Sequence, residues 1–116
     1  MTARELLSLA TPTADQLPAR IEALQVCAFD LCAEVTQLKD DAARQEEEAA
    51  TEAASESNET KRKARKCELL RANGYYQETK QQIATQERIH FQLLERTARY
   101  RREFRLHVAE TMKETL

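Results

Sequence analysis

Apolar residues recur with alternating steps of four and three along the first half of the chain. The row is Leu17, Ile21, Leu24, Ala28, Leu31, Val35, Leu38 and Ala42. Two apolar positions in every seven, repeated in this way, put one narrow apolar stripe on a helix and are typical of a coiled coil. Since such a helix is stable in water only when its stripe is covered, the pattern predicts a long helix packed against another helix.

A second and more polar row follows toward the C-terminus. Every seventh residue belongs to it: Tyr76, Ile83, His90, Thr97, Phe104 and Thr111. Leu93 and Tyr100 lie three residues after members of the row and join it as a stripe, and Leu94 and Val108 flank it. Polar positions in such a stripe weaken a coiled coil but fix its register and its partner. We therefore expect a second long helix with a specific mate.

Few turns can interrupt these helices, because the chain has one glycine and two prolines in 116 residues. Thr2 and Glu5 have the spacing of a capping box and predict a short helix near residues 3–9. Pro12 ends that helix. The next helix begins with either Thr13 or Asp15 as its cap, and Pro18 falls in its first turn, where a missing amide is tolerated.

The middle of the chain carries the weakest helix signals. Residues 39–66 contain no large apolar side chain, although Ala42, Ala49 and Ala53 could continue a thin seam. Ser and Asn at 55–58 compete with helical hydrogen bonds, so a hinge and a continuous helix are both open there. Asn73-Gly74 is the other break, with Gly74 either as a left-handed cap past a helix end or tolerated inside a helix.

Charge is distributed unevenly over these segments. Residues 1–60 hold 13 acidic and 4 basic side chains, a net charge of −9, whereas residues 61–116 hold 7 acidic and 14 basic ones, a net charge of +7. We predict an all-α, elongated coiled coil in which a short N-terminal helix precedes two long helices. An antiparallel hairpin is favoured over one extended rod, because the opposite charges and the Asn73-Gly74 break agree with it. The expected divisions are 1–12, an acidic helix within 13–58, a basic segment and turn within 59–75, and a basic helix within 76–116.

Some apolar residues lie off the first seam. Val26, Cys27 and Phe29 suggest a second apolar edge and hence more than two helices at that end of the chain. We regard the cysteines as small buried apolar residues and His90 and His107 as seam residues. Cys27 and Cys32 point about 140° apart on a helix, which suits no zinc site.

The sequence offers no catalytic, cofactor-binding or metal-ligating constellation. One glycine is too few for a phosphate-binding loop, and the acidic run 46–48 is expected to face water. We therefore expect no enzyme, no cofactor and no metal. The pattern instead indicates contacts between helices, and the candidate partner-interface residues are Leu17, Ile21, Leu24, Leu31, Val35, Leu38, Tyr76, Ile83, Leu93, Tyr100 and Phe104.

Two basic segments are candidate surfaces for an acidic partner. The first, Lys61, Arg62, Lys63, Arg65 and Lys66, resembles a nuclear localisation signal or a polyanion patch, but the favoured interpretation is a solvated helical face with pairs such as Glu59 and Lys63. The second, Arg96, Arg99, Arg101, Arg102 and Arg105, is interleaved with Tyr100 and Phe104. Its partner is the acidic half of the chain or a partner helix in our preferred interpretation. The microtubule surface comes next and nucleic acid last, because the whole chain is net acidic.

These features predict a non-enzymatic coiled-coil scaffold or adaptor subunit of a multiprotein assembly. Its partners would be other coiled-coil proteins or a second copy. In length and charge pattern, over most of its span and without one specific motif, the chain resembles small coiled-coil subunits of ciliary and vesicle-transport assemblies. That resemblance implies a cytoskeletal or ciliary, microtubule-associated role. The sequence shows no signal peptide and no membrane span, so we expect a cytoplasmic protein. The alternative is a nuclear, nucleic-acid-associated protein that uses residues 61–66 and 96–105.

Overall fold

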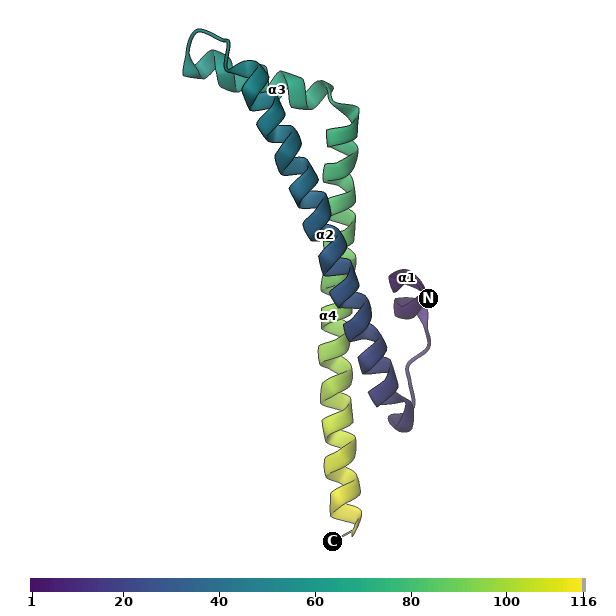
Figure 1. The fold of residues 1–116 in the computed structure, drawn as a ribbon. Helices are drawn as coiled ribbons and strands as arrows, with labels where there is room; N and C mark the ends of the chain where they lie inside the picture. The colour runs from purple at the N-terminus through teal and green to yellow at the C-terminus, as the bar shows by residue number, and fades with distance from the viewer. Residues whose placement is uncertain (116) are drawn as a thin grey trace. The chain divides into compact units, whose positions relative to one another are not determined.

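The computed structural model describes residues 1–115, and every regular element in that range is helical. The elements are α1 (Ala3–Ser8), a 3₁₀ turn η1 (Ala14–Gln16), α2 (Leu17–Ala53), α3 (Glu59–Ala72) and α4 (Gly74–Thr115). The two long helices α2 and α4 pack antiparallel (Figure 1). The predictions of an all-α fold and of a hairpin rather than an extended rod are therefore confirmed.

The described chain forms two compact units. Unit 1 combines residues 1–32 with the chain from Glu87 onward, and unit 2 is Ala33–Gln86. Each unit therefore contains one part of α2 and one part of α4.

The predicted start signals of the first helices are present. The Thr2 hydroxyl oxygen accepts a hydrogen bond from the Glu5 amide at 3.2 Å, as a capping box requires. Thr13 rather than Asp15 caps η1, and its amide donates to Gln16 Oε1 at 3.1 Å. Pro18 is the second residue of α2. Proline is accepted there because the first turn of a helix leaves its amides without intrahelical acceptors.

Unit 1 has an apolar core to which three helices contribute. Its buried members are Leu6 from α1, Leu17, Leu24, Ala28 and Leu31 from α2, and Ile89, Leu93 and Tyr100 from α4. Ala3, Leu7, Ile21, Cys27 and Phe104 pack around this cluster. A third helix, α1, is present at this end as expected. Of the three off-seam residues that indicated it, only Cys27 packs against the core, whereas Val26 and Phe29 are exposed. A helix of 6 residues is too short to be stable alone, so this packing is what holds α1 in place.

Unit 2 has a thinner apolar core. Ala42, Tyr76 and Ile83 are buried together, with Leu38 of α2 and Leu70 of α3 packed against them. Ala49 and Ala53 are also buried, so the thin alanine seam expected in the middle of the chain is real. Small side chains leave little apolar area to bury, and polar contacts consequently contribute more to this unit than to unit 1.

The chain breaks at both candidate positions. α2 ends at Ala53, and Asn58 starts α3 by accepting a hydrogen bond from the Lys61 amide at 2.9 Å, so of the two possibilities left open there the structure has a break rather than a continuous helix. Of the two roles considered for Gly74, the left-handed cap is wrong, since no residue between 1 and 115 has a positive φ. Asn73 makes the break in extended conformation, with φ −84° and ψ 96°, and Gly74 is the first residue of α4.

The second seam is shorter than its sequence pattern suggested. Tyr76, Ile83, Leu93, Thr97 and Tyr100 are buried, whereas His90 and Phe104 are half-buried. Thr111 is exposed, as is every residue of 105–115, because α2 begins at Leu17 and no described element covers the last turns of α4. Leu116, the last residue of the expected helix 76–116, lies outside the described residues.

Candidate interaction surfaces

The seam residues predicted from the heptads are covered within the single chain. Leu17, Leu24, Leu31, Val35, Tyr76, Ile83, Leu93 and Tyr100 are buried, and Ile21, Leu38 and Phe104 are half-buried. They hold α2 and α4 together inside each unit. Their additional use toward a partner chain stays a prediction.

Unit 2 contains a network of polar side chains that we call the polar lock, made of Asp41, Gln45 and Glu46 on α2 and Asn73, Tyr75 and Tyr76 at the start of α4. Asn73 Nδ2 donates to Gln45 Oε1 at 3.0 Å, and Gln45 Nε2 donates to Asp41 Oδ2 at 3.3 Å. The Tyr76 hydroxyl donates to Glu46. Asn73 Oδ1 also accepts from the Tyr76 amide at 3.1 Å. Because Gln45 is only 7% exposed, a slip of the two helices would leave its amide without partners, which fixes their register.

The polar lock alters the acidity of its two tyrosines. The hydrogen bond to Glu46, followed by burial and the charge of Glu46, raises the pKa of Tyr76 to about 12. The hydrogen bond to Asp41, followed by the charge of Asp41, also raises the pKa of Tyr75. Removing either proton would place a phenolate beside a carboxylate. The prediction that residues 46–48 simply face water is wrong for Glu46, while Glu47 and Glu48 are exposed.

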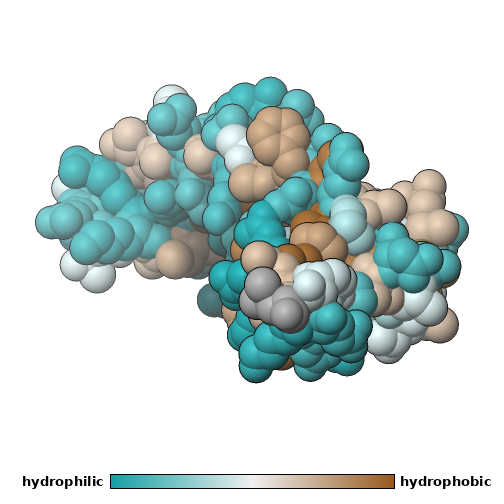
Figure 2. Space-filling view, turned by 90° about the horizontal axis from the view of Figure 1, so that it is seen from below, coloured by the Kyte–Doolittle hydropathy of each residue, from teal (hydrophilic) through white to brown (hydrophobic). Residues whose placement is uncertain are grey.

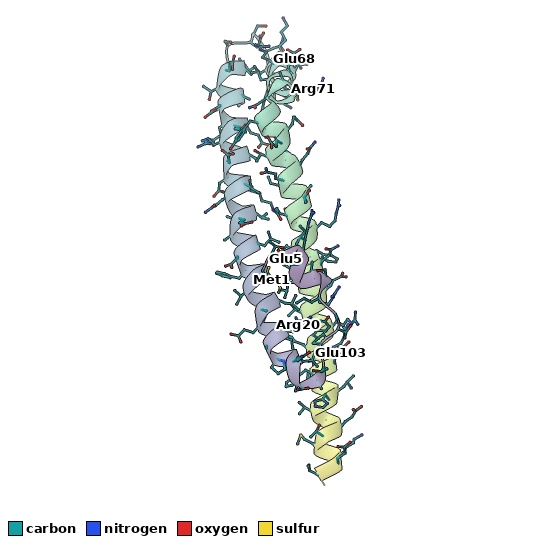
Figure 3. The ribbon with its side chains drawn as sticks, turned by 90° about the vertical axis from the view of Figure 1, so that its right-hand side faces the viewer. Met1, Glu5, Arg20, Glu68, Arg71 and Glu103 are labelled. Atoms are coloured by element: carbon teal, nitrogen blue, oxygen red, sulfur yellow. The ribbon has the colours of Figure 1, made fainter. Side chains whose placement is uncertain are left out.

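Unit 1 shows how the α2–α4 pair accepts a further helix. Arg96 Nη1 donates to the backbone carbonyl of Leu7 at 3.3 Å, at the end of α1, and the guanidinium carbon of Arg96 lies 5.9 Å from the centre of the Tyr100 ring. Arg20 Nη1 donates to the carbonyl of Ala10 at 3.0 Å. Figure 3 shows α1, marked by Met1 and Glu5, against the long helices, with Arg20 near the start of α2. Leucine side chains and an arginine bound to the Leu7 carbonyl thus hold a short helix in place.

The predicted basic surface divides into engaged and available side chains. Arg96 is half-buried against α1, and Arg99 Nε bonds Glu103 Oε1 at 3.1 Å. Arg101, Arg102 and Arg105 are exposed, and in the described range 1–115 none of them is paired with a carboxylate. These three arginines are consequently available to an anionic partner.

The basic residues of α3 form a largely solvated face. Lys61, Arg62, Lys63 and Arg65 are exposed, and Lys66 is half-buried. Lys63 pairs with Glu59 at 3.5 Å and Arg65 with Glu68 at 3.4 Å, so the expected pairs three and four residues apart do form. Exposed pairs of this kind contribute little to stability.

The cysteines and histidines differ from expectation. Cys27 is half-buried against the core of unit 1, but Cys32 and Cys67 are exposed, and so is His107. The prediction fails for Cys32 and Cys67 because their positions fall off both seams. It fails for His107 because no described element covers that part of α4, although His107 follows the heptad spacing of the second seam. Among residues 1–115, no three His, Cys, Asp or Glu side chains are grouped so as to hold a metal ion.

A second heptad row on α4, missed in the sequence, is exposed. Its members follow the positions of the second seam by one residue, with steps of four and three: Glu87, Phe91, Leu94, Ala98, Arg101, Arg105, Val108 and Met112. On α2 the matching row in unit 1 is Glu22, Gln25, Phe29 and Cys32. Phe29 is 76% exposed, Phe91 60% and Leu94 49%. Figure 2 shows hydrophobic side chains at the surface between hydrophilic ones. Leu94 and Val108, which flank the second seam in the sequence, were the signal that could have revealed this row.

The two rows line one groove. Gln25, Phe29 and Cys32 of α2 share it with Leu94, Ala98 and Arg101 of α4. Residues on the other flank of the pair, among them Leu6 and Leu9 of the α1 region and Cys27, line a separate groove. We call the first groove, together with the two exposed rows beside it, the open face of unit 1.

Comparison with known proteins gives no relative. No family model matches the chain, no curated protein is similar to it, and no solved structure resembles it. Among the described residues, no helix is apolar over a long enough stretch to cross a membrane.

Proposed function

We propose that the chain is a non-enzymatic helical scaffold or adaptor subunit that binds other helical proteins. The observation that carries this proposal is the open face of unit 1. Monomeric proteins seldom leave a row of large apolar side chains such as Phe29, Phe91 and Leu94 in water, because their burial is favourable. Rows with heptad spacing suit a partner that is itself a helix.

The way in which α2 and α4 are paired supports the same scaffold function. The α2–α4 seam uses the buried heptad residues to hold the chain together, and a separate row remains for a partner. Such a division of surfaces is what a subunit of a larger helical assembly needs. We further propose a cytoplasmic assembly of the cytoskeleton or cilium, where an acidic polymer such as the microtubule surface could contact Arg101, Arg102 and Arg105.

A second candidate function rests on the exposed bases of α3. Lys61, Arg62, Lys63 and Arg65 lie on one short helix with their side chains in solvent, as a polyanion-binding or nuclear-targeting segment requires. Nucleic-acid binding through phosphates weakens steeply as salt rises, whereas apolar packing between helices does not. The two candidates are therefore separable by salt.

Affinity capture of the tagged chain from its source cells, followed by mass spectrometry at about 0.1 M and 0.5 M salt, tests the scaffold function. We expect a few coiled-coil proteins that resist high salt and then bind the purified chain directly. A quadruple change of Lys61, Arg62, Lys63 and Arg65 to Gln should leave their recovery unchanged. Recovery mainly of nucleic-acid-binding proteins, lost after nuclease treatment and in the quadruple variant, would overturn the scaffold in favour of the second candidate.

A further inference from the structure

We propose that the open face of unit 1 binds the same face of a second copy of this chain, so that two α2–α4 hairpins form an antiparallel four-helix arrangement. This inference rests on the proposed function and names one partner for it. The occupant is a copy of the chain because both exposed rows carry apolar side chains and because their charges beside the groove are opposite.

The apolar residues of the two rows face one groove. Phe29 of α2 and Leu94 of α4 both line it, and Phe91 precedes Leu94 by one turn on the same row. A twofold axis parallel to the helices would place α2 of one copy over α4 of the other at the same height. Phe29 of each copy would then pack on Phe91 and Leu94 of the other copy. Burying aromatic and leucine side chains at the centre of an interface gives much of its binding energy.

The charged residues at one end of the rows are opposite in sign. The α2 row has Glu22 and no base, and the α4 row has Arg101 and Arg105 at the end beside Glu22, with its one acid, Glu87, at the other end. Gln25 and Arg101 line the same groove, and Glu22 lies one turn before Gln25. Because α2 and α4 are antiparallel, that turn lies on the side of Arg101 and Arg105 rather than of Leu94. In the twofold arrangement Glu22 of one copy therefore meets Arg101 of the other, and the pair occurs twice.

Unit 1 itself shows that the α2–α4 pair accepts helices on its flanks. On one flank, α1 inserts leucines into the core while Arg96 binds the Leu7 carbonyl. On the open face, Arg101 lines the groove and has no carboxylate partner in the described residues. The second copy would supply on this flank what α1 supplies on the other.

Sedimentation equilibrium of the purified full chain between about 1 and 300 µM tests the proposal, because weak specific association falls in this range. We expect a monomer–dimer equilibrium. Leu94→Gln should raise the dimer dissociation constant about tenfold or more, since it removes an apolar contact made twice. Leu106→Gln is the matched control. Leu106 is 64% exposed on the same helix but outside the row, and its change should alter the constant less than about twofold.

A charge exchange tests the pairing of α2 with α4. Glu22→Arg and Arg101→Glu should each weaken the dimer about three- to tenfold by placing like charges together, and the double variant should recover most of that loss. Circular dichroism of each variant should show unchanged helix content. A chain that stays monomeric at every concentration, equal effects of Leu94→Gln and Leu106→Gln, or a double variant weaker than both single ones would overturn the proposal. If the chain is a monomer but still captures salt-resistant helical proteins, the dimer proposal is wrong and the proposed scaffold function still holds.

Discussion

Units 1 and 2 use the same two helices but hold them together by different interactions. Unit 1 buries leucine, isoleucine and tyrosine side chains from α1, α2 and α4 around Leu24 and Leu93, both 0% exposed. Unit 2 has a small apolar cluster and joins α2 to α4 through the polar lock. Apolar packing is strong but tolerates displacement along a helix, whereas hydrogen bonds between particular side chains do not. The difference teaches that one hairpin can take its stability from one unit and its register from the other.

The largest effect should follow from opening the core of unit 1. Leu93→Ala removes a fully buried side chain and should lower the free energy of unfolding by about 2–5 kcal/mol. Urea unfolding followed by circular dichroism measures it. Leu106→Ala, on the exposed side of the same helix, should cost less than about 0.5 kcal/mol. Similar losses for both variants would mean that the unit 1 core is not where the stability comes from.

A smaller loss should follow from breaking the polar lock. Asn73→Ala removes the cap of α4 and also leaves the buried Gln45 oxygen without its donor, so we expect a loss of about 2 kcal/mol. Asn58→Ala removes only the cap of α3 and should cost about 1 kcal/mol. Thermal unfolding of the two variants side by side compares them. Equal losses would argue that the Asn73–Gln45 contact between the helices contributes nothing.

Alkaline pH should loosen unit 2 through Tyr76. The pKa of Tyr76 is raised to about 12 in the folded chain, above its ordinary value of 10.0. The neutral phenol is therefore the form that stabilises the fold. This contribution is complete below pH 10 and is lost as the pH rises from about 10 to about 12. Tyr76→Phe should cost about 1 kcal/mol near neutral pH and should become harmless near pH 12.

Measurements of unfolding free energy at several pH values, with tyrosinate absorbance to follow the ionisation, would check this behaviour. The wild-type chain and Tyr76→Phe should converge in stability as the pH rises. A constant difference between them would show that the Glu46 contact does not depend on the phenol proton.

The smallest change, and a favourable one, is expected at Gly74. An added Cβ there meets no atom within 4 Å, and the residue is helical without a positive φ. Gly74→Ala should therefore stabilise the chain by about 0.4–1 kcal/mol, because alanine loses less backbone freedom on folding. A differential scanning calorimetry trace with a lowered midpoint would show instead that the Asn73–Gly74 junction needs the flexibility of glycine.

The sequence predicted the parts of the fold that rest on periodicity. Steps of four and three placed Leu17, Leu24 and Leu31 in the core, and the Thr2–Glu5 spacing gave the first helix. The sequence could not predict the polar lock. Glu46 looks like one member of an acidic run, and only the folded hairpin brings it to Tyr76, which is distant from it along the chain. Nor could the sequence assign Gly74. Asn73 ends α3 and also caps α4, so the break between the two helices needs no residue in the left-handed conformation.

The exposed rows were partly visible. Phe29 off the first seam and Leu94 beside the second indicated additional apolar surface, but nothing in the sequence said which would be covered by α1 and which would remain open. Periodicity identifies that a helix has an apolar stripe. Only the docking of a third helix on one flank decides which stripe is left for a partner.

The docking of α1 has a consequence for how the chain folds. The contact of Arg96 with Leu7 joins residues 89 positions apart, whereas Asn73 and Gln45 are 28 apart. Closing the longer loop from an unfolded chain costs about 1 kcal/mol more in entropy. We therefore expect the hairpin to begin closing at the polar lock, with α1 added last and released first. Native-state hydrogen exchange should then find the amides of Leu6 and Leu7 exchanging well before those of Leu24 and Leu93. Simultaneous exchange would mean that α1 and the hairpin fold as one cooperative body.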